Sequence, residues 1–239
     1  METLAIETTT NIISLSLHEG NKGVLTVNKD GSGQGVVAVF TLLQDLLDKG
    51  GISAKDIGRV LVNIGPGDFS GTRVGVIFAK TLSLSMGSSL YGFNTLEVMA
   101  SGGEALDGTL IIPILDVRRG YYYFGGFKRI RNVGDREGYE LDEAFKPDCK
   151  RIEGLMESLI AIPGEKTILI QKDQVKSSLK DLFNELNYID GDLINAAGLI
   201  NAAQIFDLSN RESDPHKIFP IYPTNFEIFF KGCDASWLA

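Results

Sequence analysis

The segment that most constrains the fold of this chain is Gly65-Pro66-Gly67-Asp68-Phe69-Ser70-Gly71, which follows an apolar run and opens a helical pattern. Proline between two glycines predicts a sharp turn, because glycine adopts positive φ without a side-chain penalty. Asp68 or Ser70 can cap the following helix by accepting a hydrogen bond from its free amides. A glycine-rich loop before a helix can also hold phosphate, but no Gly-Lys-Ser/Thr follows, which excludes a Walker-type loop.

The helix predicted from about Ser70 to Met86 is nearly free of charge, since Lys80 is the one charged residue between positions 74 and 90. Small residues recur on it every four positions: Gly71, Gly75, Ala79 and Ser83. A surface helix usually has one apolar stripe and one charged face. This helix therefore needs cover on two sides. Its own sheet supplies one side, and either the second domain or another subunit supplies the other.

The first hundred residues predict three meandering strands, a helix, a strand, a helix and a strand. Strands are expected at 3–7, 12–17, 24–27, 59–64 and 89–93, and helices at 36–47, 70–86 and 94–100. This order resembles the half-unit of the actin/Hsp70/sugar-kinase superfamily. We therefore expect an α/β, two-domain actin/Hsp70-like (ASKHA, ribonuclease-H-like) fold with mixed sheets flanked by helices. The glycine-rich break at Ser101-Gly102-Gly103 predicts domains at 1–104 and 105–239.

The second half predicts strands at 109–115, 121–127 and 167–170, a helix at 151–160 and an irregular polar hairpin within 131–150. A late helix, about 193–208, is expected to be able to pack back on the first domain. Strand alternation predicts that Tyr121 and Tyr123 share one face and that Tyr122 and Phe124 share the other, as core packing rather than a base-stacking platform. The aromatic tail 224–239 has no role that its sequence identifies.

Composition excludes several classes of protein. The formal charge of −8, from 23 basic and 31 acidic residues, argues against a direct grip on nucleic acid, which needs clustered Lys and Arg. The two cysteines, Cys149 and Cys233, form no Cys-x-x-Cys motif and are expected as reduced thiols. The most apolar stretch, 74–90, is too short and polar to span a bilayer. No signal-peptide pattern opens the chain, so a cytoplasmic location is expected.

Four segments resemble one family. The sequence GPGDFSGTRVGVIFAKTLS is similar to the GPGSFTGLRIG…AKGLA motif of the TsaB (YeaZ) family, and LAIETTT at 4–10 is similar to its LAIDTST. DVRRGYY at 116–122 and PIYP at 220–223 resemble its DARRGEVY and P-x-Y motifs. The chain departs from the family at Glu7, where Asp is usual, and at positions 31–35, where the family carries a His-Ser pair.

The resemblance implies a non-catalytic scaffold that pairs with a TsaD-type threonylcarbamoyltransferase acting on tRNA next to the anticodon. It implies a homodimer when the chain is alone, a possible TsaE-like ATPase partner, only indirect contact with tRNA and no membrane. The chain would carry no cofactor of its own, while ATP and metal would belong to partner subunits. Catalytic relatives hold metal through a His-x-x-x-His helix, whereas this chain has only His18 and His216, far apart.

Two sets of residues follow as predictions. The partner or dimer interface is expected to consist of Val36, Phe40, Leu43, Val74, Gly75, Phe78, Ala79 and Leu82. Arginine at Gly75 or Ala79 should then abolish docking and leave the fold intact. A vestigial phosphate site is expected from Glu7, Thr8, Thr9, Gly67, Asp116, Arg118 and Arg119. An acetate- or sugar-kinase-like phosphotransferase with a degraded site remains the alternative, and an exposed turn with ordinary ion pairs remains open for the two arginines.

Overall fold

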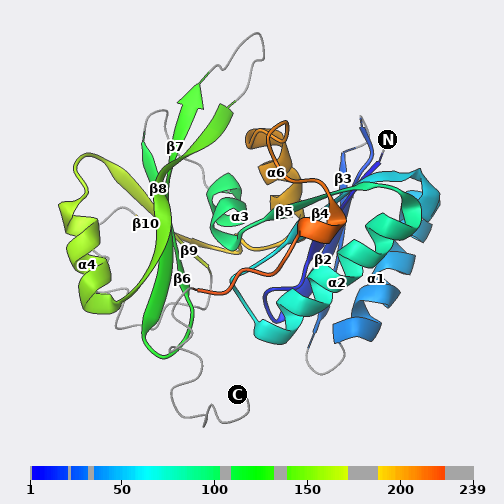
Figure 1. The fold of residues 1–239 in the computed structure, drawn as a ribbon, viewed down its shortest axis with the longest axis horizontal. Coiled ribbons are helices and arrows are strands. Elements are labelled where there is room, and N and C mark those ends of the chain that lie inside the picture. The colour runs from blue at the N-terminus through cyan, green and yellow to red at the C-terminus, as the bar shows by residue number, and fades with distance from the viewer. Residues whose placement is uncertain are drawn as a thin grey trace.

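The computed structural model describes residues 2–20, 23–31, 35–102, 109–131, 139–171 and 188–223. They form two lobes, each built on a mixed five-stranded sheet (Figure 1). The strands of the first sheet are β1 (Glu2–Glu7), β2 (Ile12–His18), β3 (Val24–Asp30), β4 (Ile57–Asn63) and β5 (Ser89–Phe93). Their order is β3-β2-β1-β4-β5, with β1 antiparallel to β2 and parallel to β4.

Two helices cover one face of the first sheet. Helix α1 (Gly35–Gly50) packs against β2 and β3, and α2 (Phe69–Met86) packs mainly against β4. Because successive side chains of a strand point to opposite faces, Leu4 and Ile6 join the core under these helices, whereas Ala5 joins the core on the opposite face. A short 3₁₀ helix, η2 (Ala54–Asp56), precedes β4.

The second sheet repeats the strand order of the first. Its strands are β6 (Leu110–Asp116), β7 (Tyr121–Arg131), β8 (Tyr139–Arg151), β9 (Lys166–Gln171) and β10 (Tyr188–Gly191). The order is β10-β9-β6-β7-β8, so β6 takes the place that β1 has in the first sheet. Helix α4 (Ile152–Ala161) packs on this sheet over a third core. The predicted fold class, two mixed sheets flanked by helices, is confirmed.

The polar segment 131–150 differs from its prediction. Its described part, from residue 139 on, pairs with β7 as the predicted hairpin implies, but it forms the long strand β8, with a shift in register opposite Gly126, where irregular structure was expected. Since β8 lies at the edge of the sheet, its polar side chains can face solvent, and the ladder with β7 fixes its backbone. The alternation along 121–124 is confirmed, because Tyr123 belongs to the core between the lobes and Tyr122 and Phe124 belong to the core under α4.

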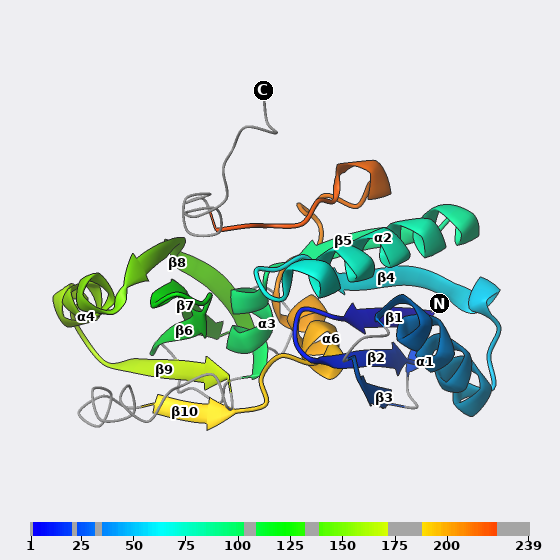
Figure 2. The same ribbon diagram turned by 90° about the horizontal axis from the view of Figure 1, so that it is seen from below.

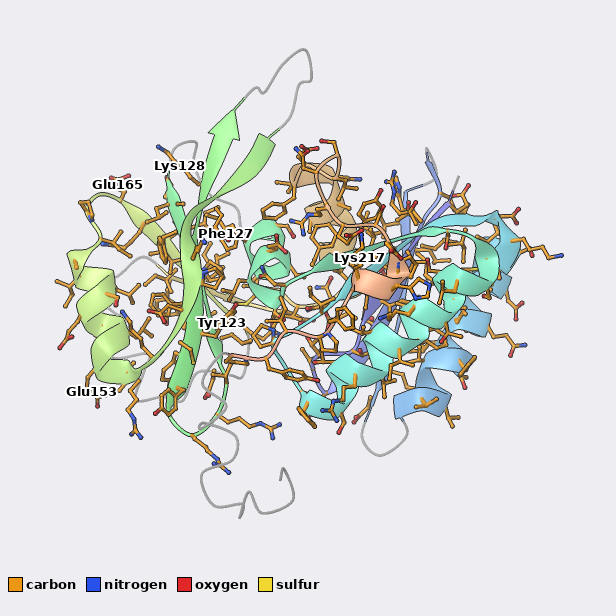
Figure 3. All side chains as sticks on the ribbon, in the orientation of Figure 1. Tyr123, Phe127, Lys128, Glu153, Glu165 and Lys217 are labelled. Carbon is orange, nitrogen blue, oxygen red and sulfur yellow. The ribbon has the colours of Figure 1, made fainter. Side chains whose placement is uncertain are left out.

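The lobes exchange helices. Helix α3 (Thr95–Gly102) follows the first sheet but packs on β6 and β9, while α6 (Ala196–Ile205) follows the second sheet but packs on β1 and β2. The two helices lie against each other between the sheets (Figure 2). Phe127 of β7 belongs to the core that these two helices form, and it lies on the α3 side of the second sheet (Figure 3). The predicted boundary at 101–103 falls at the end of α3, and residues 103–108 lie outside the described part.

The last described segment, 206–223, returns to the first lobe. It contains the 3₁₀ helix η3 (Pro215–Lys217), which contacts α2 and β5. Lys80 of α2 donates from Nζ to the carbonyl oxygen of Ile218 at 3.0 Å, and Ile221 N donates to Ile64 O at 2.6 Å. The tail 224–239 lies outside the described residues. No helix within the described ranges is both long enough and apolar enough to cross a membrane.

Candidate functional site

The glycines of the 65–75 motif allow α2 to approach the end of β1. A Cβ added at Gly67 would lie 2.5 Å from the Thr9 backbone oxygen and side chain. A Cβ at Gly71 would overlap the carbonyl oxygen of Thr8, and one at Gly75 would overlap the Thr8 hydroxyl. Thr8 Oγ1 also donates to the Gly71 carbonyl oxygen at 2.7 Å. The glycine spacing therefore serves close packing inside the first lobe.

The small-residue stripe is consequently not the docking surface that its spacing suggested. Gly75 and Ala79 are buried against the first lobe's own sheet, and Phe78 and Leu43 belong to the same core. The prediction for these four residues was wrong, because a stripe of small residues permits close approach equally well within a chain and between chains. Arginine at Gly75 or Ala79 would disrupt the fold rather than test docking.

The remaining four predicted interface residues divide into two pairs. Val74 and Leu82 are half-buried and pack against the core of the first lobe. Val36 and Phe40 are exposed, and the Phe40 ring packs edge-on against Phe78 at 4.8 Å between centroids. These two therefore lie where a partner could reach them.

Six large apolar side chains of α1 and α2 are exposed to solvent, and we call them the outer helical face: Val36, Val37, Phe40, Phe69, Ile77 and Leu84. Their exposed fractions run from 42% at Phe69 to 65% at Val37, so each leaves a large part of its surface in water. The sequence prediction missed Val37, Phe69, Ile77 and Leu84 as interface candidates. The signal was present, because Ile77 and Leu84 lie opposite the small-residue stripe on the same helix.

Glu7, at the end of β1, is completely buried and held by hydrogen bonds. Its Oε1 accepts from Thr9 N at 2.5 Å and from Thr9 Oγ1 at 2.6 Å, and its Oε2 accepts from Asn63 Nδ2 at 2.6 Å. Asn63 Oδ1 in turn accepts from Gly65 N and from Thr95 Oγ1. Burial raises the pKa of the Glu7 carboxyl above its usual range, and the hydrogen bonds from Thr9 and Asn63 oppose that shift.

These hydrogen bonds change part of the predicted vestigial phosphate site. Glu7 and Thr8 do not line the cleft between the lobes, since their side chains are used inside the first lobe. Glu7 braces the turn at the cis Gly65-Pro66 bond, through Asn63, instead of facing a ligand.

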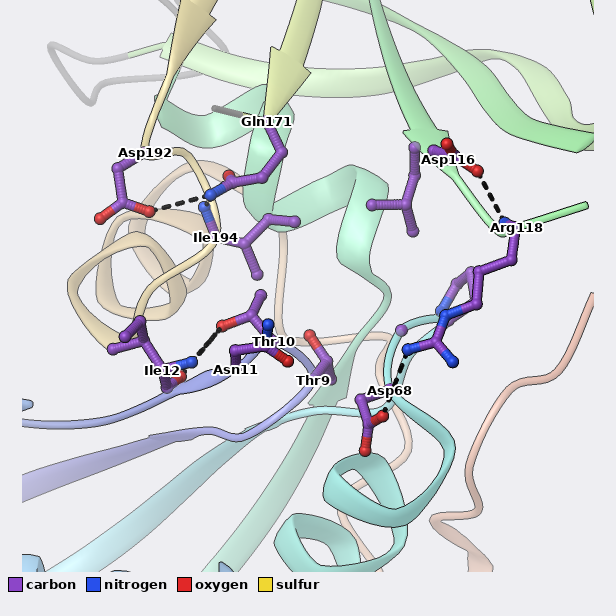
Figure 4. Close-up of a pocket in the computed structure, with 13 residues that line it drawn as sticks. Thr9, Thr10, Asn11, Ile12, Asp68, Asp116, Arg118, Gln171, Asp192 and Ile194 are labelled. Carbon is purple, nitrogen blue, oxygen red and sulfur yellow. Dashed lines mark hydrogen bonds and ion pairs between the residues drawn. The ribbon is translucent and has the colours of Figure 1, made fainter. Parts of the chain in front are cut away.

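The cleft itself has a volume of about 480 Å³ and lies between the strand ends of both lobes (Figure 4). Four predicted residues line it: Thr9, Gly67, Asp116 and Arg118. Asp68, Gln171 and Asp192 line it as well, and Gln171 Nε2 donates to Asp192 Oδ1 at 3.0 Å. Arg119 lines a smaller pocket beside Phe69, which adjoins the cleft and shares Gly67, Asp116 and Arg118 with it.

Arg118 reaches across the mouth of the cleft from the β6–β7 turn. Its Nη2 lies 3.7 Å from Asp68 Oδ2, and its backbone amide donates to Asp116 Oδ1 at 2.7 Å. Arg118 and Arg119 both have positive φ, at 74° and 54°, which is uncommon for residues other than glycine. The predicted exposed turn with an ordinary ion pair describes Arg118 well, because its side chain is 79% exposed.

The charges of the cleft do not favour a polyphosphate. Asp68, Asp116 and Asp192 contribute three carboxylates, while Arg118 is the one cationic side chain among the lining residues. Among the described residues, no group of three or more His, Cys, Asp or Glu side chains is arranged to hold a metal ion. A phosphate in the cleft would therefore face three carboxylates and the single guanidinium group of Arg118.

Comparison with known proteins places the chain in a family. A family model described as "TsaD: tRNA N6-adenosine threonylcarbamoyltransferase" matches residues 30–187, more than half of the chain. Proteins named tRNA threonylcarbamoyladenosine biosynthesis protein TsaB are 33% identical over 129 residues in Bacillus subtilis and 31% identical over 150 residues in Escherichia coli. The chain belongs to the family that this model describes, and it is similar to the TsaB proteins over part of its length.

The extent of the TsaB matches is limited. They cover 52% and 62% of this chain, and they span only 54% of the Bacillus and 64% of the Escherichia protein. The fold matches over more of its length. A solved structure titled "YeaZ from Pseudomonas aeruginosa" has a TM-score of 0.68 at 16% identity, covering 92% of this chain and 99% of that one. A second Pseudomonas aeruginosa structure, with similarity to peptidase YEAZ, gives 0.70, also at 16% identity, covering 93% of this chain and 99% of that one.

Proposed function

We propose that the chain is a non-catalytic accessory subunit that pairs with a TsaD-like transferase in the biosynthesis of threonylcarbamoyladenosine in tRNA. The TsaB relatives carry that pathway in their names, and the matching family model is that of the transferase. The observation that carries the proposal is the outer helical face. It offers exposed apolar side chains on two helices that contact each other.

The outer helical face suits a helix-to-helix interface. Single exposed apolar residues are normal on soluble proteins, but several on neighbouring helices mark interaction sites. Phe40 of α1 is 56% exposed, and Ile77 of α2 is 64% exposed. Burying such aromatic and aliphatic side chains supplies most of the affinity of an interface. In the absence of the partner, the same face would join two copies as an isologous homodimer.

The division of labour within the complex follows from charge and from the cleft. With a formal charge of −8, this subunit would contact tRNA only through its partner. ATP and metal would be held by the transferase and by a TsaE-like ATPase. The kinase-like alternative is not favoured, since Glu7 is buried under hydrogen bonds and carboxylates dominate the cleft. The kinase-like alternative predicts that the isolated chain binds ATP at micromolar concentration and turns it over in the presence of metal. Calorimetry that detects neither would exclude it.

The test compares two exposed isoleucines on opposite lobes. Ile77→Arg places a charge in the outer helical face, while Ile160→Arg makes the same change on α4, where Ile160 is 75% exposed. We expect Ile77→Arg to weaken the affinity for the TsaD-like subunit by about tenfold or more, measured by titration calorimetry, because a central interface residue is lost. Ile160→Arg should bind like the wild type. Equal binding by the folded Ile77 variant contradicts the assignment of this face.

A further inference from the structure

Arg211, in the segment that follows α6, contacts several parts of the chain near the boundary of the two lobes. Its Nη1 donates to the Gly92 carbonyl oxygen of β5 at 3.0 Å, and its Nη2 pairs with Glu97 Oε1 of α3. The guanidinium carbon lies 4.3 Å from the centre of the Phe93 ring and 5.5 Å from that of Phe206. One side chain thus links β5, α3 and the chain leaving α6.

Phe206 continues this contact into the second lobe. Its ring lies 6.5 Å from that of Phe93 in the first sheet and 5.8 Å from that of Phe127 in the second, between centroids. The two rings that Phe206 touches come from different sheets, so Phe206 is a bridge between the lobes. Arg211 covers this bridge by stacking on Phe93 and Phe206 together.

Glu97, the partner of Arg211, also fixes the start of α3. Its Oε2 accepts from Asn94 N at 2.8 Å, and Glu97 N donates to Asn94 Oδ1 at 2.9 Å, which is a reciprocal cap of the helix. The side chains of Glu97 and Arg211 are only 13% and 23% exposed. Removing either one would leave the other poorly solvated and without its charge partner.

The Glu97–Arg211 ion pair connects elements that pack on different sheets. It joins the beginning of α3, which packs on the second sheet, to the segment after α6, which packs on the first. Hinge closure in two-lobed proteins needs such exchanged elements to slide or rotate. At the mouth of the cleft, the exposed Arg118–Asp68 pair is a weaker restraint, because solvent and salt screen an exposed ion pair.

We propose that Arg211 is a positioning residue that fixes the angle between the two lobes. With Glu97 and the Phe93–Phe206–Phe127 rings it forms a clamp, and the clamp makes the molecule a rigid body instead of a hinged one. The cleft then keeps one width whether or not a nucleotide is offered. This inference concerns the described residues of the chain alone and does not depend on the docking proposal.

Distance measurements between spin labels test the clamp. Labels at Thr41→Cys on α1 and Ile160→Cys on α4 report on the two lobes, since both positions are exposed. Cys149 and Cys233 are replaced by serine in this background. We expect one narrow distance distribution for the otherwise unchanged chain. Arg211→Met, which keeps an apolar stem over the rings, should broaden it and add a second population of about 10% or more.

A matched arginine supplies the control. Arg59 lies 5.9 Å from the centre of the Tyr91 ring, and both residues belong to the first sheet, so Arg59→Met removes a ring contact that lies within one lobe. Its distribution should stay narrow, whereas general loosening of the fold would broaden both variants equally and would overturn the proposal. A wild-type distribution for folded Arg211→Met would overturn it too. If Arg211→Met does not fold, Glu97→Gln provides the same comparison, and an unchanged distribution there contradicts the clamp.

Discussion

At the scale of single residues, the first lobe depends on three glycines that face two threonines. Gly67 approaches Thr9, while Gly71 and Gly75 approach the carbonyl oxygen and hydroxyl of Thr8. The resulting contact brings the start of α2 against the end of β1. Next to it, Glu7 collects hydrogen bonds from Thr9 and Asn63. The same few residues therefore set both the backbone path and the surroundings of the buried carboxyl group in this corner.

Replacing Gly75 with alanine tests the close approach. Because the added methyl group would overlap the Thr8 hydroxyl, we expect Gly75→Ala to lower the free energy of unfolding by about 1–3 kcal/mol. Gly35→Ala is the matched control, since a Cβ there meets no atom within 4 Å at the start of α1. Denaturant titration of both variants measures the difference. Equal stability of the two variants would show that the Thr8 contact is not tight.

The buried Glu7 predicts a dependence of stability on pH. Its pKa is raised in the folded state from the usual 4.5, so the folded protein holds this proton at higher pH than the unfolded chain does. The stabilising contribution is complete below pH 4.5 and is lost as pH rises through the raised value.

Glu7→Gln removes this titration. The unfolding free energy of the wild type, minus that of Glu7→Gln, should therefore fall as pH rises above 4.5. Denaturant titrations at a series of pH values measure it. A difference that stays constant or grows would mean that the hydrogen bonds outweigh burial.

Sequence reasoning predicted the glycine turn and the uncharged helix correctly but misplaced the surface that they serve. The repeat Gly71, Gly75, Ala79 indicates that another segment packs closely against the helix. Only the tertiary structure identifies that segment as the one that contains Thr8. Likewise, Glu7 sits where a phosphate site was expected, yet its burial depends on Asn63, 56 positions further along the chain. No local pattern reveals that partner.

At the scale of elements, the start of α2 combines a helix cap with a contact across the cleft. Asp68 Oδ1 accepts from Gly71 N at 2.8 Å, while Asp68 Oδ2 lies 3.7 Å from Arg118. The cap satisfies an amide that the helix cannot satisfy itself. The ion pair, in contrast, lies in solvent with Arg118 79% exposed.

The two roles of Asp68 can be separated by two variants. Asp68→Ala should lower the free energy of unfolding by about 1 kcal/mol, which is the usual value of a helix cap. Arg118→Ala should change it by less, because an exposed ion pair contributes about 0–1 kcal/mol and salt screens it. Thermal or denaturant unfolding at low and high salt compares them. A larger loss of unfolding free energy for Arg118→Ala than for Asp68→Ala would mean that the ion pair stabilises the protein more than the helix cap does.

Most elements could be predicted from periodicity, but two strands of the second sheet, β8 and the short β10, were not predicted as strands. Strand β8 is polar and contains Pro147, so its sequence lacks the alternation that marks a half-buried strand. It is a strand because β7 offers it a long ladder at the sheet edge. Tertiary pairing thus overrode local propensity in β8.

At the scale of the whole molecule, the repeated strand order of the two sheets explains why the first hundred residues were enough to predict the fold class. The exchange of α3 and α6 between the lobes was harder to foresee, because both helices are apolar on more than one side and fit either sheet. That exchange, with the Arg211 clamp, makes the lobes one body. The cleft is left with a paired arginine and three carboxylates, and the outer helical face is left open.

We propose that the chain acts in threonylcarbamoyladenosine formation through the outer helical face. The most direct test measures this nucleoside in digested tRNA from cells that lack their own copy of the chain and express a variant. We expect the wild type and Ile160→Arg to restore the modification and Ile77→Arg to fail at equal protein level. Full restoration by Ile77→Arg, or no restoration by the wild type, would contradict the account.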